Sequence, residues 1–464
     1  MSFRVYSKLP IWRSNCQSLH LGGVQRSAYA VPATARPSSE IIPNIILENN
    51  LADCSSKTRQ INEQAPYMVK TYVRPSPVFV KGKGCYLWDS LGKKYLDFTA
   101  GIAVNALGHC DSQIAETLLH TSNLYHNTWT GALSQILVQT TIKTGAMHDC
   151  ESVFICNSGA EANEAAIKFA RKSGKIIDPS GEKYQLVSFH NSFHGRTMGA
   201  LSATPNPKYQ KPFSPMIPGF NYGVYNDVTS INELVTQKTC GVIVEPIQGE
   251  GGVIVGTDEF LTALASRCQE VGAVLIYDEI QCGLSRTGNF WAHSTLPKSA
   301  HPDIITTAKA LGNGFPIGAT IVNKSVSEKI MVGDHGTTFG GNPLGSRIAH
   351  HIVGRLSDPK FLADVAEKSK IFRENLQNLQ NKHTDLIQEI RGKGLILGLQ
   401  LSRDPNPIIT AALEKGLLII TAGTNTIRIV PSLTVTKQEI IRGVQILDEA
   451  IEAIDVPSQK ADSM

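Results

Sequence analysis

The sequence predicts an α/β protein in which a mostly parallel β-sheet forms the larger part and a smaller α+β unit follows it. Three observations lead to this fold class. The chain has 464 residues, which is too many for one small core. Between residues 152 and 321, short apolar runs alternate with helical stretches, as in βαβ units. Beyond residue 344, a long helical stretch precedes a second group of apolar runs.

The strands of the larger sheet are expected where short apolar runs stand between helical stretches. These runs are Val153–Cys156, Gln185–Phe189, Gly241–Glu245, Val274–Tyr277 and Asp303–Thr306. Strands that are apolar throughout are buried on both faces, which is typical of a parallel sheet covered by helices. Ligands of such sheets bind beyond the carboxyl ends of the strands, so we expect the chemistry there.

The flanking segments complete the expected order of elements. Residues 67–98 alternate in polarity between glycine turns and predict a small group of strands. Residues 114–144 predict a helix that breaks around residues 128–131. The C-terminal elements are expected to be strands at Gly392–Leu401, Leu417–Thr421 and Ile427–Val430 and a helix at Lys437–Ile454.

These elements predict four consecutive segments. Residues 1–36 form a leader, and residues 37–104 form an N-terminal segment with small strands. Residues 105–343 form the large domain and residues 344–464 the small domain.

The leader differs from the rest of the chain in charge. Residues 1–39 carry basic side chains and no acidic one, although the net charge of the whole chain is only +4. The basic residues are Arg4, Lys8, Arg13, Arg26 and Arg36. A Ser- and Arg-rich start without acids predicts a mitochondrial transit peptide and hence a location in the mitochondrial matrix. A disordered tail without a targeting role is the alternative interpretation.

Composition argues against several classes of protein. Apolar residues make up 42% and charged residues 18% of the chain, which is an ordinary globular mixture. No apolar run approaches the roughly 18 residues that span a bilayer, so no membrane partner is expected. The nearly neutral body shows no preference for nucleic acid. The 9 cysteines form no CxxC pair, so neither a metal site nor a disulfide framework is expected.

A turn between an expected strand and a helix gives the first chemical signal. The segment Val153–Asn163 passes through Ser158, Gly159 and Ala160 before the helix begins. Free N–H groups and the helix dipole at such a start bind anions, and glycine lets the backbone approach a phosphate closely. The spacing is neither GxGxxG nor a Walker loop, so a nucleotide site is not indicated. A plainly capped helix would explain the turn equally well.

Three charged side chains follow expected strands. Glu245 and Asp278 come directly after buried strands, where a carboxylate must be paired. Asp278 could face a protonated ring nitrogen, and a helix cap or a structural ion pair is the competing interpretation. Lys309 ends a hydrophobic segment, where a low dielectric would lower its pKa and make it a nucleophile or base. An ordinary lysine would instead extend to the solvent.

The order of these signals resembles the class III aminotransferases, which are enzymes of pyridoxal-phosphate fold type I. Six motifs carry the resemblance: NSGAEAN, FHGRT, EPIQGEGG, DEIQCGLSRTG, AKALGNGFP and HGTTFGGNP. It extends from about residue 67 to about residue 433. The resemblance implies a mostly parallel seven-stranded sheet in the large domain, a smaller α+β domain, and pyridoxal 5′-phosphate (PLP) as cofactor.

The resemblance also implies which residues contact the cofactor. Lys309 would carry the cofactor covalently and move the proton during the reaction, and Asp278 would keep the ring nitrogen protonated. Phe193 would stack on the ring and Gln281 would contact the phenolic oxygen. Thr338 would reach the phosphate of the other subunit, which implies a homodimer with active sites at the interface. The full set of implied cofactor contacts is Ser158, Gly159, Ala160, Phe193, Asp278, Gln281, Lys309 and Thr338.

Substrate contacts are implied as well. Both implied substrates carry carboxylates, which guanidinium groups bind in a bidentate manner. Arg196 would hold the carboxylate of acetylornithine, and Arg428 the α-carboxylate of glutamate. Glu245 would pair with Arg428 and release it during the reaction, and a permanent structural pair is the alternative. Thr337 and Tyr72 are further candidate substrate contacts.

Within the family, the sequence is similar to the acetylornithine branch. Residues 120–125 and the FHGRT motif are typical of that branch. Ornithine aminotransferases usually have Trp at the position of His194 and a Tyr at the position of Ile102. Losing that hydroxyl would leave room for an acyl group.

The implied reaction transfers the δ-amino group of N2-acetyl-L-ornithine to 2-oxoglutarate in arginine biosynthesis. Ornithine, 4-aminobutyrate and succinyl-diaminopimelate remain alternative donors. A PLP aminomutase and a catalytically silent binding protein remain alternative functions.

Overall fold

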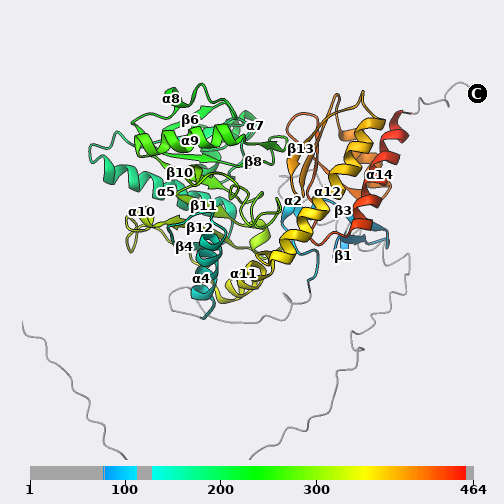
Figure 1. Ribbon diagram of the computed structural model, residues 1–464, viewed down its shortest axis with the longest axis horizontal. Coiled ribbons are helices and arrows are strands. Elements are labelled where there is room, and N and C mark those ends of the chain that lie inside the picture. Colours follow the sequence, from blue (N-terminus) through cyan, green and yellow to red (C-terminus); the bar gives the residue numbers. More distant parts are fainter. Residues whose placement is uncertain (1–76, 78, 112–127, 456–464) are drawn as a thin grey trace, which may run out of the picture. The chain divides into compact units, whose positions relative to one another are not determined.

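The structure is a computed structural model that describes residue 77, residues 79–111 and residues 128–455 (Figure 1). All of these residues fall within one compact unit. The leader and Tyr72 lie outside the described residues, and so do residues 120–125, which carry part of the resemblance to the acetylornithine branch. The domain boundaries expected from the sequence remain predictions.

The larger sheet has seven strands and is mostly parallel, as predicted. Their order across the sheet is β4-β12-β11-β10-β7-β5-β6. Strand β12 runs antiparallel to both of its neighbours, and every other neighbouring pair is parallel. The strands are β4 (Cys150–Cys156), β5 (Gln185–Phe189), β6 (Phe220–Gly223), β7 (Thr239–Val244), β10 (Val274–Asp278), β11 (Ile304–Thr307) and β12 (Gly318–Asn323).

Two helices cover the two faces of this sheet, α5 (Gly159–Ile177) and α9 (Asp258–Val271). Strand β10 shows the arrangement, because successive side chains of a strand point to opposite faces. Leu275 and Tyr277 pack in a cluster with the apolar side of α9. Val274 and Ile276 pack in a cluster with α5. A strand buried on both faces must be apolar throughout, which is the pattern that the sequence displays.

The smaller sheet is antiparallel and lies near the C-terminal helices. Its order is β13-β14-β17-β16. These strands are β13 (Ile387–Lys393), β14 (Ile396–Leu401), β16 (Ile420–Ala422) and β17 (Thr426–Ile429). The helices of this part are α12 (Pro359–Lys382), α13 (Asn406–Glu414) and α14 (Lys437–Asp455). Helix α11 (Pro343–Leu356) precedes them and packs against α4 (Thr128–Lys143).

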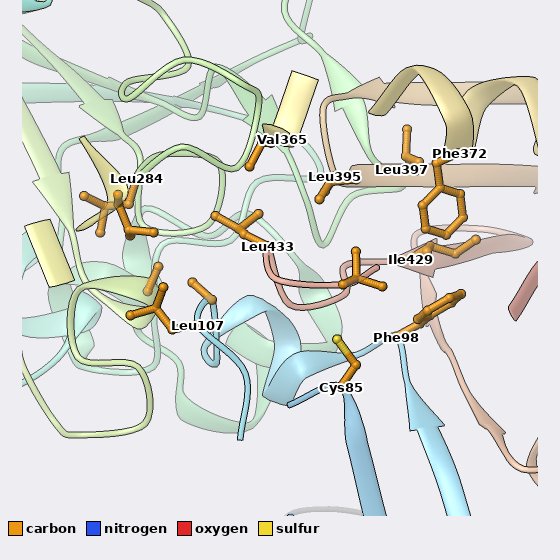
Figure 2. Close-up of a cluster of buried hydrophobic side chains, with 14 of the residues drawn as sticks. Cys85, Phe98, Leu107, Leu284, Val365, Phe372, Leu395, Leu397, Ile429 and Leu433 are labelled. Carbon is orange, nitrogen blue, oxygen red and sulfur yellow. The ribbon is translucent and has the colours of Figure 1, made fainter. Parts of the chain in front are cut away.

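The N-terminal strands join this C-terminal part. Strands β1 (Phe79–Lys83), β2 (Tyr86–Asp89) and β3 (Lys94–Asp97) form a sheet that β15 (Leu417–Leu418) extends. Phe98 continues from β3 into the core shown in Figure 2, where its ring lies 5.4 Å from that of Phe372 in α12. The same core contains Leu397 and Ile429 from the smaller sheet. Residues far apart in the sequence therefore share one hydrophobic cluster.

Several sequence expectations were wrong in detail. Helix α4 (Thr128–Lys143) begins where the break was expected and continues through Gly131, and the earlier part of the expected helix lies outside the described residues. The long helical stretch beyond residue 344 is two helices, because Pro359 begins a new helix capped by Asp358. The expected strand Gly392–Leu401 is a hairpin that turns at Gly394, where a Cβ atom would collide with the carbonyl of Arg286. Helix α13 was not expected.

The remaining elements are short and connect the larger ones. The helical segments are α2 (Ala100–Ala103), α6 (Met198–Ser202), α7 (Pro207–Gln210), η2 (Lys211–Phe213), α8 (Ile231–Leu234), η3 (Lys298–Ala300), η4 (Lys309–Leu311) and α10 (Lys324–Ser327). A two-stranded hairpin, β8 (Ile247–Gln248) and β9 (Ile254–Val255), follows β7.

Candidate active site

A cavity of about 400 Å³ lies beyond the carboxyl ends of the strands of the larger sheet. Segments that follow β4, β5, β7, β10 and β11 all contribute to its lining. This is the position that a mostly parallel sheet predicts for a ligand. Nine of the residues singled out from the sequence as site residues line it: Ser158, Gly159, Ala160, Phe193, Arg196, Glu245, Asp278, Gln281 and Lys309.

The start of α5 forms one end of the cavity. Ser158 caps the helix, since its Oγ accepts the N–H of Glu161 at 3.2 Å. Gly159 and Ala160 follow with their N–H groups at the positive end of a 19-residue helix. A Cβ atom on Gly159 would lie 2.8 Å from the Cδ1 atom of Ile280, so a larger residue here would require the Ile280 side chain to shift. The turn is thus a capped helix start, and the N–H groups at this start are the ones that an anion site would use.

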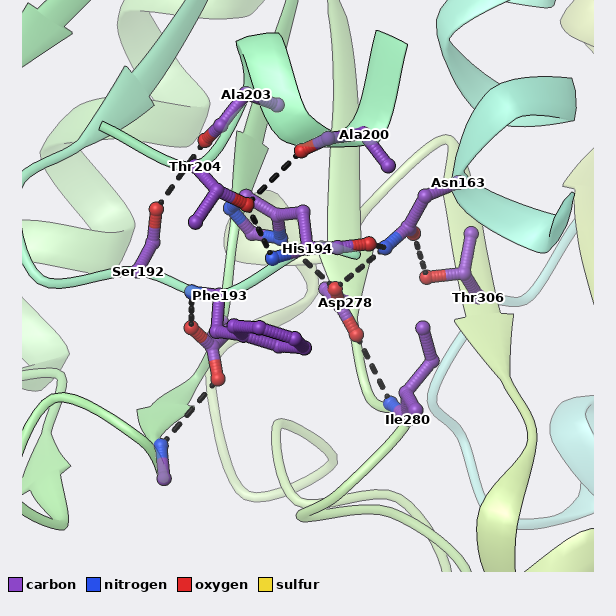
Figure 3. A network of polar contacts seen from close by, with 12 residues as sticks. Asn163, Ser192, Phe193, His194, Ala200, Ala203, Thr204, Asp278, Ile280 and Thr306 are labelled. Carbon is purple, nitrogen blue, oxygen red and sulfur yellow. Dashed lines mark hydrogen bonds and ion pairs between the residues drawn. The ribbon is translucent and has the colours of Figure 1, made fainter. Parts of the chain in front are cut away.

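Asp278 is held by a network of polar contacts, which Figure 3 shows. Its Oδ2 accepts hydrogen bonds from Nδ2 of Asn163 and Nδ1 of His194, both at 2.8 Å. Its Oδ1 accepts a hydrogen bond from the backbone N–H of Ile280 at 3.1 Å. The amide of Asn163 is itself oriented, because its Oδ1 accepts the hydroxyl of Thr306 at 2.7 Å. A buried carboxylate with this support can face a cationic group in the cavity.

Lys309 follows β11 and faces the same cavity. Its backbone φ of 39° is in the left-handed region, which is unfavourable for a residue other than glycine. The side chain is partly accessible because it borders the cavity, and protein atoms otherwise surround it. Burial, followed by the charge of Arg428, lowers the pKa of Lys309 to about 8. Its amine is therefore easier to deprotonate than an ordinary lysine amine.

Glu245 is not the ion-pair partner of Arg428, so the expected pair is wrong. The carboxylate of Glu245 accepts the backbone N–H groups of Phe193 at 2.9 Å and of Gly249 at 3.3 Å. Arg428 instead contacts Glu250, with Nη2 2.9 Å from Oε2. The physical reason is position: Glu245 directly follows the buried strand β7, whereas Glu250 lies in the turn between β8 and β9.

Glu250 is therefore a site residue that the sequence analysis missed. It lines the cavity together with Glu245. The EPIQGEGG motif contains both acids, and only the fold shows which of them faces Arg428. Arg428 also places Nη1 3.4 Å from Oε1 of Gln281, which borders the cavity.

Burial raises the pKa of Glu245 to about 7, with the charge of Asp278 acting in the same direction. The charge of His194 and the two backbone N–H groups act against this shift. The side chain is only 4% exposed, so desolvation is the expected largest effect. Glu245 is thus a carboxyl group that can change its protonation state near neutral pH.

The other candidate residues lie at or beyond the border of the cavity. Thr337 accepts Nδ2 of Asn157 at 2.9 Å through its hydroxyl, and Asn157 lines the cavity. Thr338 is exposed and does not line it. Tyr72, a candidate substrate contact, lies outside the residues that the structure describes.

Ile102 and His194 stand at the two positions where ornithine aminotransferases usually have Tyr and Trp, and they lie in different places. Ile102 is 41% exposed and does not line the cavity, whereas its neighbour Val104 does. His194 is buried and contacts Asp278. The contribution of Ile102 to donor choice therefore has no direct structural support within this chain.

Within the described residues, no group of His, Cys, Asp and Glu side chains is arranged to hold a metal ion. In the same part of the chain, no helix is long and apolar enough to cross a membrane.

Comparison with known proteins gives consistent matches. The family profile for class III aminotransferases matches residues 67–451. The mitochondrial acetylornithine aminotransferase of Neurospora crassa is 62% identical, over 92% of this chain and 95% of its own length.

Solved structures match over similar lengths. The N-acetylornithine aminotransferase of Stenotrophomonas maltophilia K279a superposes with a TM-score of 0.71 at 34% identity, covering 85% of this chain and 99% of that one. An ornithine aminotransferase of Toxoplasma gondii, described with partial occupancy of PLP at its active site, superposes with a TM-score of 0.79 at 29% identity. It covers 88% of this chain and 98% of its own.

Proposed function

Because the chain belongs to the class III aminotransferase family, we propose that it transfers the δ-amino group of N2-acetyl-L-ornithine to 2-oxoglutarate. The products are N-acetyl-L-glutamate 5-semialdehyde and L-glutamate, and the reaction is a step of arginine biosynthesis in the mitochondrion. The 62% identity to a mitochondrial acetylornithine aminotransferase over 92% of the chain supports this substrate and this location.

We propose PLP as the cofactor, since the residues of the cavity complement its three functional groups. The N-terminus of α5 suits the phosphate, the carboxylate of Asp278 suits a protonated ring nitrogen, and the amine of Lys309 suits the aldehyde. Gly159 allows the close backbone approach that a phosphate needs. When bound, PLP accepts an amino group at its aldehyde and withdraws electrons through its ring.

A single observation carries the proposal: Lys309 and Asp278 line one cavity, at whose end α5 begins. Asp278 supplies the charge that keeps a ring nitrogen protonated, because three donors fix its orientation and burial strengthens its interactions. Lys309 supplies an amine whose lowered pKa lets Nζ accept and return a proton near neutral pH.

Arg196 and Arg428 are the proposed carboxylate-binding residues for the two substrates. Arg196 is exposed and lines the cavity, so its guanidinium is available to the α-carboxylate of acetylornithine. Arg428 is nearly fully buried and is paired with Glu250. A dicarboxylate such as 2-oxoglutarate must displace Glu250 to use Arg428, so Glu250 takes the role that the sequence suggested for Glu245. Thr337 remains a proposed substrate contact, because its hydroxyl is hydrogen-bonded to Asn157, which lines the cavity.

We also propose that the protein is a homodimer in which Thr338 reaches the phosphate bound by the partner subunit. The exposure of Thr338 and of the neighbouring Phe339, which is 71% exposed, supports a contact with another chain.

The amino-donor profile of the purified full-length protein tests the function. Its turnover with 2-oxoglutarate is measured for acetylornithine, ornithine, 4-aminobutyrate and succinyl-diaminopimelate at equal concentrations. Acetylornithine is expected to give the highest kcat/KM, and a clear preference for free ornithine would refute the proposed substrate. Turnover of a donor without any 2-oxoglutarate would instead indicate an aminomutase.

A further inference from the structure

Arg196 lies at the border of the cavity with its guanidinium stacked on an aromatic ring. Its Cζ atom lies 3.9 Å from the ring centroid of Tyr209 and 5.5 Å from that of Phe193. Within the part of the chain that the structure describes, Arg196 makes neither an ion pair nor a hydrogen bond with a protein group. The guanidinium therefore rests on these two rings, and that of Tyr209 is the closer.

Tyr209 is itself held firmly in place. It belongs to the short helical turn α7, which Asn206 caps by accepting the N–H of Lys208 at 3.0 Å. Gln210, the next residue, donates Nε2 to the carbonyl of Leu201 at 3.0 Å. The ring of Tyr209 also meets Phe193 edge to face, at 6.2 Å between centroids. The position of the ring is therefore set by the protein.

Stacking suits a guanidinium that must bind a carboxylate. An exposed arginine side chain loses much conformational freedom when it binds a ligand, and a contact that restricts it beforehand reduces that loss. A guanidinium that lies over a ring keeps its N–H groups in its own plane, where a carboxylate binds them in a bidentate manner. Aromatic support thus orients the group without occupying its donors.

We propose that Tyr209 is a positioning residue that holds Arg196 for the substrate carboxylate and so determines the preference for amino donors that carry one. The inference rests on the proposed function, because it assigns the donor carboxylate to Arg196. It goes beyond that function by naming a residue that does not belong to any of the motifs from which the site was predicted.

The hydroxyl of Tyr209 makes a second, weaker connection. It lies 3.5 Å from Oε1 of Glu250, at the outer limit of a hydrogen bond, and Oε2 of Glu250 contacts Arg428. Burial and the charge of Glu250 raise the pKa of Tyr209, so the hydroxyl keeps its proton. Tyr209 therefore lies between the two proposed carboxylate-binding arginines, with its ring on Arg196 and its hydroxyl near the partner of Arg428.

The test compares two donors that differ only in the carboxylate. Acetylornithine and its decarboxylated analogue N-acetyl-1,4-diaminobutane have the same chain length and the same reactive amine. In Tyr209→Leu, the KM for acetylornithine is expected to rise about fivefold to tenfold, the range of a stacked cation–π contact. The kcat/KM for the analogue is expected to remain within about twofold of wild type. Tyr209→Phe keeps the ring and is expected to restore the wild-type KM for acetylornithine.

Two controls separate positioning from general damage. Tyr184 is another partly exposed tyrosine that does not line the cavity, so Tyr184→Leu is expected to leave both donors unaffected. In an Arg196→Gln background, adding Tyr209→Leu is expected to raise the KM for acetylornithine by less than about twofold, since residues that act through each other are not additive. Full additivity of the two substitutions would overturn the proposal.

A binding measurement removes the dependence on turnover. N-acetyl-L-norvaline has the acetyl group and carboxylate of acetylornithine but no δ-amine, so it binds the holoenzyme without reacting. Calorimetric titration is expected to show weaker binding to Tyr209→Leu and unchanged binding to Tyr209→Phe. Equal affinity for all three proteins would refute the positioning role even if acetylornithine is the substrate. A wild-type enzyme that neither binds this probe nor prefers acetylornithine would instead refute the proposed function.

Discussion

The Nδ1 atom of His194 lies 2.8 Å from the Oδ2 atom of Asp278, and both side chains are buried. A carboxylate only accepts hydrogen bonds, so Nδ1 must carry the hydrogen in this contact. The Nε2 atom of His194 is buried and has no hydrogen-bond partner among the described residues. The imidazole ring therefore makes one hydrogen bond, to Asp278, and this bond orients the carboxylate.

Replacing His194 by Leu should therefore weaken both the fold and the proposed cofactor site. Asp278 would lose one of its two side-chain donors, and a buried carboxylate left partly unsatisfied costs about 1–3 kcal/mol. The free energy of unfolding in urea and the dissociation constant for PLP would measure the two effects. His190 is exposed in the same loop, so His190→Leu should stay within about 0.5 kcal/mol of wild type. Equal stability of the two variants would contradict this account.

The rate at which the cofactor-free protein takes up PLP should depend on pH through Lys309. An amine reacts with an aldehyde only when it is neutral, and burial lowers the pKa of Lys309 to about 8 from the ordinary 10.5. The neutral fraction therefore grows as pH rises through about 8, so the uptake rate should rise and level off above that pH. Absorbance measured from pH 6 to pH 10 would follow the reaction. Lys309→Ala should show no covalent uptake at any pH, and a wild-type rate that has not levelled off by pH 10 would show that burial does not lower the pKa of this lysine.

The ion pair between Arg428 and Glu250 predicts different effects for the two acids of the EPIQGEGG motif. Glu250→Gln removes the charge that competes with a substrate carboxylate for Arg428, so the KM for 2-oxoglutarate should fall roughly threefold to tenfold. Glu245→Gln should not lower it, because Glu245 contacts backbone N–H groups and not Arg428. Steady-state kinetics at saturating acetylornithine would compare the two. A lower KM in Glu245→Gln alone would restore the pairing expected from the sequence.

The contact between α14 and Phe98 makes a stability prediction. A Cβ atom at Gly443 would collide with the Phe98 ring, so Gly443→Ala should overpack the core and destabilise the fold by about 1–3 kcal/mol. Gly354 lies in α11, where an added Cβ would come no closer than 3.9 Å to Ile136. Gly354→Ala should therefore stabilise by about 0.5–1 kcal/mol, because alanine favours a helix. Thermal unfolding of the two variants would show shifts of opposite sign, and a stable Gly443→Ala would contradict the packing.

Much of the larger sheet could be predicted because its signals are local. A strand buried on both faces must be apolar along its whole length, and Val274–Asp278 shows this directly in the sequence. The start of α5 is equally local, since Ser158 caps the helix three residues before Glu161. Elements that depend on distant contacts were less predictable. The hairpin turn at Gly394 depends on Arg286, more than a hundred residues earlier in the chain.

The same division applies to the candidate site. By itself, the sequence determined the family, the strands at whose ends the cavity lies, and the presence of Asp278, Lys309 and the turn at Gly159 in its lining. Only the tertiary structure decided that Arg428 pairs with Glu250 rather than Glu245, that His194 supports Asp278, and that Tyr209 lies against Arg196. A motif specifies residue types along the chain, whereas the direction of a side chain depends on where its strand ends and on which distant segment packs against it.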